Sequence, residues 1–311
     1  MKIAACCTIV VAAGLAASTQ LSFSASATSA PQVRTAADLS LPLDRFDLSS
    51  DEQSIVQEAR FKLLKACMRT FDAQLAPPEV SPVRVPRNAA YLQWLGHYEV
   101  AKYGYAGPPG LAEEIDAAQD GRRGFAVSRA SMQVLKGQVK EAAGRDVPAG
   151  GCDGRVAGLL DSSGGDLVGS ALPVGGEQRL YEWADEAAEA GNDPRLHEVE
   201  AVWSACMKDA GFDYATPIKA QLDPRWAVTV NNDDNPPPRG TADEIRTAVA
   251  DEKCRISTNY YGARKAIYSE YQEKLIAEHR TELDAIRSRN SARLENAQKY
   301  LRGGLKLPSI W

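Results

Sequence analysis

The sequence has few of the residues, and none of the short motifs, that mark well-known catalytic sites. It holds only three histidines, and neither H-E-x-x-H nor G-x-S-x-G occurs. Residues 161–166 and 231–235 are rich in oxygen ligands, but neither stretch has the spacing of an EF-hand loop. We therefore expect no metal, no cofactor and no catalytic residue, with a triad assembled from distant residues left as an alternative.

The sequence also has no excess of positive charge. It has no long apolar run beyond the N-terminus. The formal net charge is −5, and no basic stripe with interleaved aromatic residues occurs. Such a chain has no bulk attraction for nucleic acid or anionic membranes. Its 44% hydrophobic and 25% charged residues are typical of a folded globular protein. The sequence thus predicts no nucleic-acid partner and no membrane span.

The N-terminus has the pattern of a secretory signal peptide. One lysine precedes an apolar run over residues 3–17, and small residues at 25–27 form a cleavage site. The run is shorter than the roughly 20 residues that a membrane anchor needs. Cys6 and Cys7 lie before or inside it, which argues against a lipoprotein. We expect a signal peptide over residues 1–27, cleavage near Ala27, and a secreted or extracytoplasmic protein.

Two related phrases carry the cysteines of the mature chain. Residues 66–72 and 205–213 both read Ala-Cys-Met-basic and then end on Phe-Asp. Cys67 is followed downstream by Cys152, and Cys206 by Cys254. An even number of cysteines in an oxidising compartment indicates disulfides. Four cysteines allow three connectivities, and the repeated phrase favours sequential pairing. A zinc site is not indicated, because no two of these cysteines have the close spacing of a zinc knuckle.

Apolar spacing of three or four residues predicts an all-α protein with two related halves. Residues 28–48 show no period and are interpreted as a polar linker. The first half, residues 49–175, begins with a helix whose capping box is assigned to Ser50 and Gln53. The second half, residues 176–311, ends in a long helical pattern with a kink or interruption at Gly262. Other helices are expected at about 88–102, within 111–145, after Cys152, at 177–190 and at 194–210.

The last part of the C-terminal helix is strongly polar. Its large apolar residues beyond position 277 are Leu283, Ile286, Leu294 and Leu301. Because helical stability comes mainly from burying a face, this segment is expected to pack little against the body. It is the predicted element for self-association or for a partner.

Several phrases together resemble a family of exported, uncharacterised actinobacterial proteins with paired Cys-Met helix phrases and two disulfides. They are Cys67-Met68, Gly150-Gly151-Cys152, residues 203–207 with Gly211-Phe212, and residues 250–254. The resemblance covers most of residues 50–265, although the first phrase lacks the glycine of the second. It implies export and sequential disulfide pairing, and it implies no particular activity.

Aromatic side chains with polar tips give the main candidate binding surface, and four tyrosines at 260, 261, 268 and 271 offer a similar one on the long helix. Tyr91, Trp94, His97 and Tyr98 lie close together, and three of them are expected to share a helix face. Such residues line sites for sugars and peptides, but they also pack cores. The predicted function is non-catalytic binding of an extracellular protein or a cell-wall component. The alternative is an extracellular hydrolase without a recognisable motif.

Overall fold

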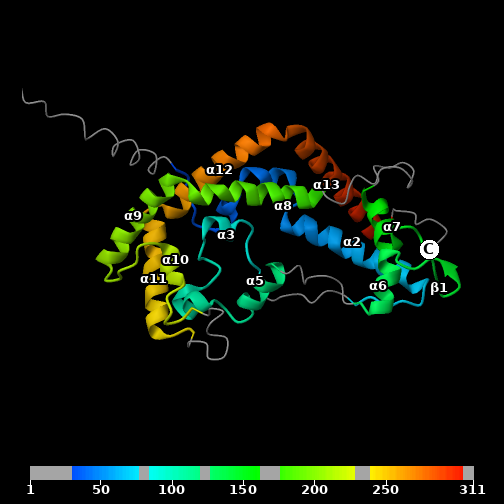
Figure 1. Cartoon of the computed structure of the whole chain (residues 1–311), viewed down its shortest axis with the longest axis horizontal. Coiled ribbons are helices and arrows are strands. Elements are labelled where there is room, and N and C mark those ends of the chain that lie inside the picture. Colours follow the sequence, from blue (N-terminus) through cyan, green and yellow to red (C-terminus); the bar gives the residue numbers. More distant parts are fainter. Residues whose placement is uncertain (1–29, 77–83, 120–126, 162–175, 228–238, 304–311) are drawn as a thin grey trace, which may run out of the picture.

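The structure is a computed structural model that describes residues 30–76, 84–119, 127–161, 176–227 and 239–303. The expected signal peptide and the 231–235 loop lie outside these residues. The described chain is predominantly helical, as predicted (Figure 1). Its α-helices are α2 Ser50–Arg69, α3 Ala89–Leu92, α4 Val100–Tyr103, α5 Leu111–Gln119, α6 Arg129–Lys136, α7 Gly151–Asp161, α8 Gly176–Glu186, α9 Pro194–Asp209, α10 Pro217–Gln221, α11 Ala242–Ser257, α12 Tyr260–Glu278 and α13 Arg280–Leu301.

Short elements complete the described fold. The 3-10 helices are η1 Ala36–Leu39, η2 Pro42–Phe46, η3 Gly104–Ala106 and η4 Ala187–Asn192. An antiparallel hairpin pairs β1 Glu141–Ala142 with β2 Arg145–Asp146. Its turn residues Ala143 and Gly144 both have positive φ, as tight hairpin turns require. Strands of two residues are too short to show a period in the sequence.

The two disulfides join Cys67 to Cys152 and Cys206 to Cys254, which confirms sequential pairing. Each joins helices within a separate packing region. The first disulfide region comprises α2, α6, α7 and the C-terminal part of α13. The second disulfide region comprises α3, α4 and α9–α12. Figure 1 shows them at opposite ends, joined by the orange and red arch of α12 and α13.

The packing does not follow the boundary expected between residues 175 and 176. Leu92, Val100 and Tyr105 precede this boundary but are buried in the second disulfide region. Ala297, near the end of the chain, is buried in the first. Each region is therefore built from segments on both sides of the expected division.

Residues 30–48, here called the N-terminal strap, are not the polar linker that was expected. Val33, Leu39 and Leu41 are buried in the second disulfide region, and Leu48 in the first. Between them, Leu43 and Phe46 fill a junction with α8, α12 and α13. The apolar residues are spaced irregularly because the strap forms two short 3-10 helices, and this hides their burial from a search for periods.

The strap is also held by hydrogen bonds. The Gln272 side chain accepts from the Leu43 amide at 2.9 Å, and Asn290 donates to the Phe46 carbonyl at 3.1 Å. Gly262 faces the strap, since a side chain there would collide with the Pro31 carbonyl. That close approach explains a glycine inside α12, where the sequence had suggested a kink.

The long C-terminal pattern forms three helices. The breaks fall at Asn259, which has φ 51°, and at His279, while Gly262 lies within α12. The expectation that the last segment packs little is wrong. α13 lies against α2 and α7, and it buries Leu283, Ile286, Asn290, Asn296 and Ala297. Self-association through this helix stays a prediction, but the argument from an unpacked face no longer supports it.

The start of α2 also differs slightly from the prediction. Ser49 is the N-cap, and its side chain accepts from the Glu52 amide while Glu52 accepts from the Ser49 amide. The capping box assigned to Ser50 and Gln53 is therefore one residue out of register. Both pairs satisfy the motif in sequence, so only the backbone geometry separates them.

Candidate functional site

The four predicted aromatic residues do not share one helix. α3 ends at Leu92, and Gln93 and Glu99 adopt left-handed conformations with φ 52° and 49°. The helix expected over residues 88–102 is therefore broken into α3 and α4. Gly96, between them, is a residue type that marks a break, whereas Gln93 and Glu99, where the backbone turns left-handed, are not.

Their side chains are partly buried against the second disulfide region. The Tyr91 hydroxyl donates to Asp185 at 2.9 Å, and the Tyr91 carbonyl accepts from Arg264 at 2.8 Å. Trp94 stacks on His97 with ring centroids 5.7 Å apart, and Tyr98 lies 4.5 Å from His97. Burial lowers the pKa of His97 to about 4. Core packing accounts for these contacts, and a binding role stays a prediction.

A buried ionic network lies beneath the aromatic residues. The Asp251 carboxylate accepts from Trp203 Nε1 and the Tyr105 hydroxyl, both at 2.8 Å. It also accepts from Nε and Nη2 of Arg255 at 2.7 Å each. Burial alone would lower the pKa of Arg255, but the adjacent Asp251 carboxylate holds it above its usual value. With four donors on Asp251, this network is built for structure and leaves no obvious site for a substrate proton.

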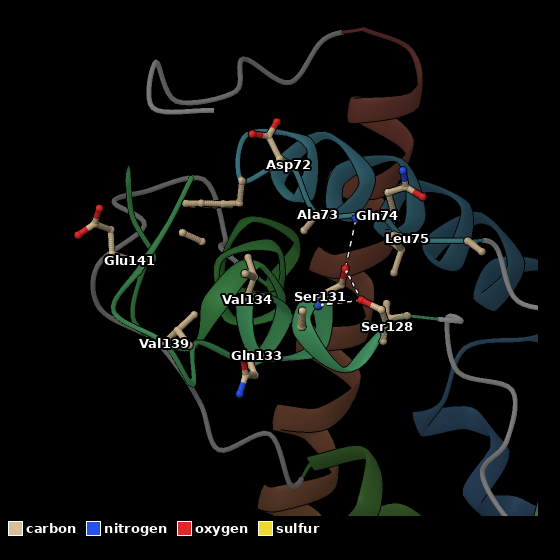
Figure 2. A pocket seen from close by; sticks show the side chains of 15 residues that line it. Asp72, Ala73, Gln74, Leu75, Ser128, Ser131, Gln133, Val134, Val139 and Glu141 are labelled. Atoms are coloured by element: carbon tan, nitrogen blue, oxygen red, sulfur yellow. Dashed lines mark hydrogen bonds between the residues drawn. The ribbon is translucent and has the colours of Figure 1, made fainter. Parts of the chain in front are cut away.

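A large cavity lies in the first disulfide region, at the end of the first Cys-Met phrase. We call it the α2–α6 groove; its volume is about 800 Å³. It is open to solvent and lies between the chain that follows α2, helix α6 and strand β1 (Figure 2). Its lining comprises Phe71, Asp72, Ala73, Gln74, Leu75, Ala76, Val127, Ser128, Ala130, Ser131, Gln133, Val134, Val139, Glu141 and Ala142.

Local backbone signals shape this groove. Beyond α2, Asp72 has φ 54°, and the Ala73 amide donates back to the Met68 carbonyl, which turns the chain away from the helix axis. Ser128 caps α6 by accepting from the Ser131 amide at 3.1 Å. The Ser131 hydroxyl in turn accepts from the Gln74 amide, and this bond joins the two walls in Figure 2.

The chemistry of the lining is apolar and neutral, with two acidic groups. Leu75 and Val134 are buried at its base, whereas Gln74 and Gln133 are exposed. Figure 2 shows the Asp72 and Glu141 carboxylates at separate edges and pointing outward. The lining includes no histidine, cysteine, lysine or arginine. It can therefore cover apolar groups and exchange hydrogen bonds, but it brings no nucleophile together with a base.

Within 30–76, 84–119, 127–161, 176–227 and 239–303, no three His, Cys, Asp or Glu side chains gather closely enough to hold a metal ion. No helix in those ranges combines the length and the apolar character needed to cross a membrane. No family model, curated protein or solved structure matches the chain.

Sequence reasoning missed the α2–α6 groove. Its residues come from three separate stretches, of which only Phe71 and Asp72 belong to a noticed motif. The signal that could have pointed to it is the left-handed turn after the first phrase, where the second phrase has Gly211 instead. The left-handed backbone conformation of Asp72 could not be predicted from its residue type alone.

Proposed function

We propose that this chain is a non-catalytic binding protein that acts outside the cytoplasm through its α2–α6 groove. The observation that carries the proposal is the open groove of about 800 Å³ with an apolar base and exposed amide side chains. This volume lies in the range of ligand sites, roughly 300–1,000 Å³. Export rests on the signal-like N-terminus and on two disulfides, which persist mainly in oxidising compartments.

The chemistry of the groove favours an extended peptide segment of an extracellular protein. Leu75, Val134 and Val139 offer apolar surface, and exposed Gln74 and Gln133 can pair with peptide groups. Asp72 and Glu141 place negative charge at two edges, which favours lysine or arginine beside the apolar residues of the ligand. The proposed ligand is thus a short apolar sequence with basic flanks.

Selection of random peptides displayed on phage tests this proposal. The bait is the folded mature chain with both disulfides intact, and a matched pair of variants on α6 serves as comparison. Ala130→Arg places a long side chain in the groove, whereas Met132→Arg places it at an exposed position outside the lining. Peptides with apolar centres and basic flanks should be enriched. They should bind Ala130→Arg at least about tenfold more weakly than wild type, or about 1.4 kcal/mol.

Met132→Arg should retain the affinity of wild type for the same peptides. Equal binding by both variants would place the binding surface elsewhere. Enrichment of acidic peptides, or none at all, would contradict the ligand chemistry. Circular dichroism of both variants checks that each is folded before the affinities are compared.

A further inference from the structure

The two disulfides differ in their access to solvent. Cys67 and Cys152 are 4% and 0% exposed and lie inside the apolar core of the first disulfide region. In the second region Cys254 is 2% exposed, but Cys206 is partly exposed on the surface of α9. The Cys206 sulfur lies 3.7 Å from the hydroxyl of Ser257, which is exposed. Solvent can therefore reach one sulfur of the second disulfide and neither residue of the first.

The accessible sulfur belongs to the wall of a second groove, between α9 and α11. This α9–α11 groove has a volume of about 470 Å³ and is open to solvent. Ala210, Val249 and Ala250 give it apolar surface beside the disulfide. It is large enough for a small molecule to approach Cys206 without any opening of the fold.

Positive charge lies at the edge of the α9–α11 groove. Lys253 is exposed, and within the described residues no hydrogen bond or ion pair engages it. Arg246 also lines the groove, although Asp243 pairs with it. An unpaired ammonium next to the disulfide attracts an anion and stabilises thiolate relative to thiol.

We propose that the Cys206–Cys254 disulfide is an exchange site for an anionic low-molecular-weight thiol. The thiolate attacks Cys206 Sγ, the Cys206–Cys254 bond breaks, and Cys254 leaves as a thiolate that takes up a proton. A second thiolate then attacks the thiol-derived sulfur of the mixed disulfide, the bond to Cys206 Sγ breaks, and Cys206 leaves as a thiolate that takes up a proton. The low-molecular-weight thiol is oxidised to its disulfide, and the protein retains two reduced cysteines. This inference rests on the α9–α11 groove and does not depend on the function proposed for the α2–α6 groove.

The same reaction at Cys67–Cys152 requires the core to open first. Because neither residue is accessible, exchange there is limited by the rare population in which α2 and α7 separate. Exchange at Cys206 needs no such opening. The two disulfides should therefore be reduced at different rates in the native protein, although one cysteine of each belongs to a related phrase.

Reduction kinetics of the native oxidised protein test this directly. The protein is incubated with 2-mercaptoethanesulfonate without denaturant, the reaction is stopped by alkylation, and each cysteine is quantified by peptide mass spectrometry. We expect alkylation of Cys206 and Cys254 at least roughly tenfold faster than that of Cys67 and Cys152. A transient adduct of the thiol should appear on Cys206. Equal rates, or faster loss of the first disulfide, would overturn the proposal.

The contribution of charge is tested with two lysine variants of equal net charge. Lys253→Gln removes the cation beside the disulfide, and Lys299→Gln removes an exposed cation on α13 in the other region. Rates are expressed per concentration of thiolate. On that scale, Lys253→Gln should lower the rate at which 2-mercaptoethanesulfonate reduces the Cys206–Cys254 disulfide roughly two- to threefold. The neutral 2-mercaptoethanol should react with both variants at the wild-type rate. Equal slowing by Lys299→Gln, or no slowing of the anionic thiol by Lys253→Gln, would refute the anionic preference.

Discussion

The two disulfide regions surround their related phrases with different chemistry. Aligned on Cys67 and Cys206, the following methionines Met68 and Met207 are both fully buried. Three residues before the cysteine, however, Leu64 corresponds to Trp203. One residue after the second cysteine, Asp153 corresponds to Arg255, and these differ most in their surroundings.

Asp153 remains near the surface, whereas Arg255 is enclosed. The Asp153 side chain is 21% exposed and accepts from Arg60 and Lys136 at 2.7 Å each. Arg255 is 0% exposed, and its charge is balanced inside the core by Asp251, which precedes Cys254 by three residues within α11. The residue three positions before Cys152 is Ala149, which lies ahead of α7 and carries no charge. The first region thus has an apolar centre with ion pairs outside it, and the second has an ion pair at its centre.

This difference shows what the repeated phrase determines and what it does not. The Ala-Cys-Met pattern gives a buried methionine and a cysteine that is bonded to a partner helix. The residues around it decide whether that interface is apolar or ionic. An apolar interface is stabilised in proportion to its buried area. An interface with a buried charge holds only while every partner is present, because an unpaired buried charge costs several kcal/mol.

The largest expected effect comes from removing α13, which completes the first region. Deleting residues 280–311 exposes the surfaces of the first region that Leu294, Ala297 and Leu301 cover, and the junction surfaces that Leu283 and Ile286 cover. At about 1.5–3 kcal/mol for each large side chain, the first region and the junction together should lose roughly 5 kcal/mol or more. Hydrogen exchange read peptide by peptide should show α2 and α7 unprotected while α9 and α11 keep most of their protection.

A point variant on the same helix provides the control for that deletion. Asp284→Ala removes only exposed ion pairs with Arg280 and Arg287, and it should cost less than about 1 kcal/mol. If the truncated chain melted like wild type, α13 would not be part of the first region's core. If α9 and α11 lost protection equally, the two regions would form a single cooperative unit.

The next effect compares Trp203 with Leu64. Trp203→Ala should cost about 3–5 kcal/mol and Leu64→Ala about 2–5 kcal/mol, since both side chains are fully buried. The informative variant is Trp203→Phe, which keeps an aromatic ring but removes the Nε1 donor to Asp251. It should still cost about 1–3 kcal/mol in urea unfolding because a buried carboxylate loses a partner. A Trp203→Phe variant as stable as wild type would show that Trp203 contributes only apolar area.

A smaller effect concerns pH. Burial lowers the pKa of His97 from 6.5 to about 4, so the folded state favours the neutral ring. The contribution of the neutral His97 ring to the free energy of unfolding is therefore fully present above pH 6.5 and is lost as pH falls toward 4. Burial raises the pKa of Glu200 and Glu252 in the same region, and these groups act in the opposite direction. The His97 contribution must therefore be measured as a difference between two proteins.

His97→Phe keeps a flat ring beside Trp94 and removes the titrating group. The melting temperature of wild type relative to this variant should fall between pH 6.5 and 4 and should stay constant above pH 7. Calorimetry across this range gives the comparison. A difference that stays the same at every pH would show that His97 titrates normally in the folded protein.

Strong local signals made part of the fold predictable from sequence. Asp193 before Pro194 and the apolar stripe through Trp203 define α9, and the repeated phrase favoured the disulfide pairing. The strap and α13 were misjudged because their burial depends on distant segments. Asn290 and Asn296 look polar in the sequence, yet each is buried while donating to a backbone carbonyl. Neither groove was predictable from the sequence. The α9–α11 groove is formed by helices that are far apart in the chain, and the α2–α6 groove depends on a left-handed turn at Asp72 that residue type does not predict.

A double-mutant cycle tests most directly the claim that the two regions are stabilised differently. Unfolding free energies are measured for Asp251→Leu, Arg255→Met and the double variant, and in parallel for Arg60→Met, Asp153→Leu and their double variant. We predict a coupling of about 3 kcal/mol between Asp251 and Arg255, because either single variant leaves a buried charge unpaired. The coupling between Arg60 and Asp153 should stay below about 1 kcal/mol, since both are partly exposed. Equal coupling energies in the two pairs would contradict this account.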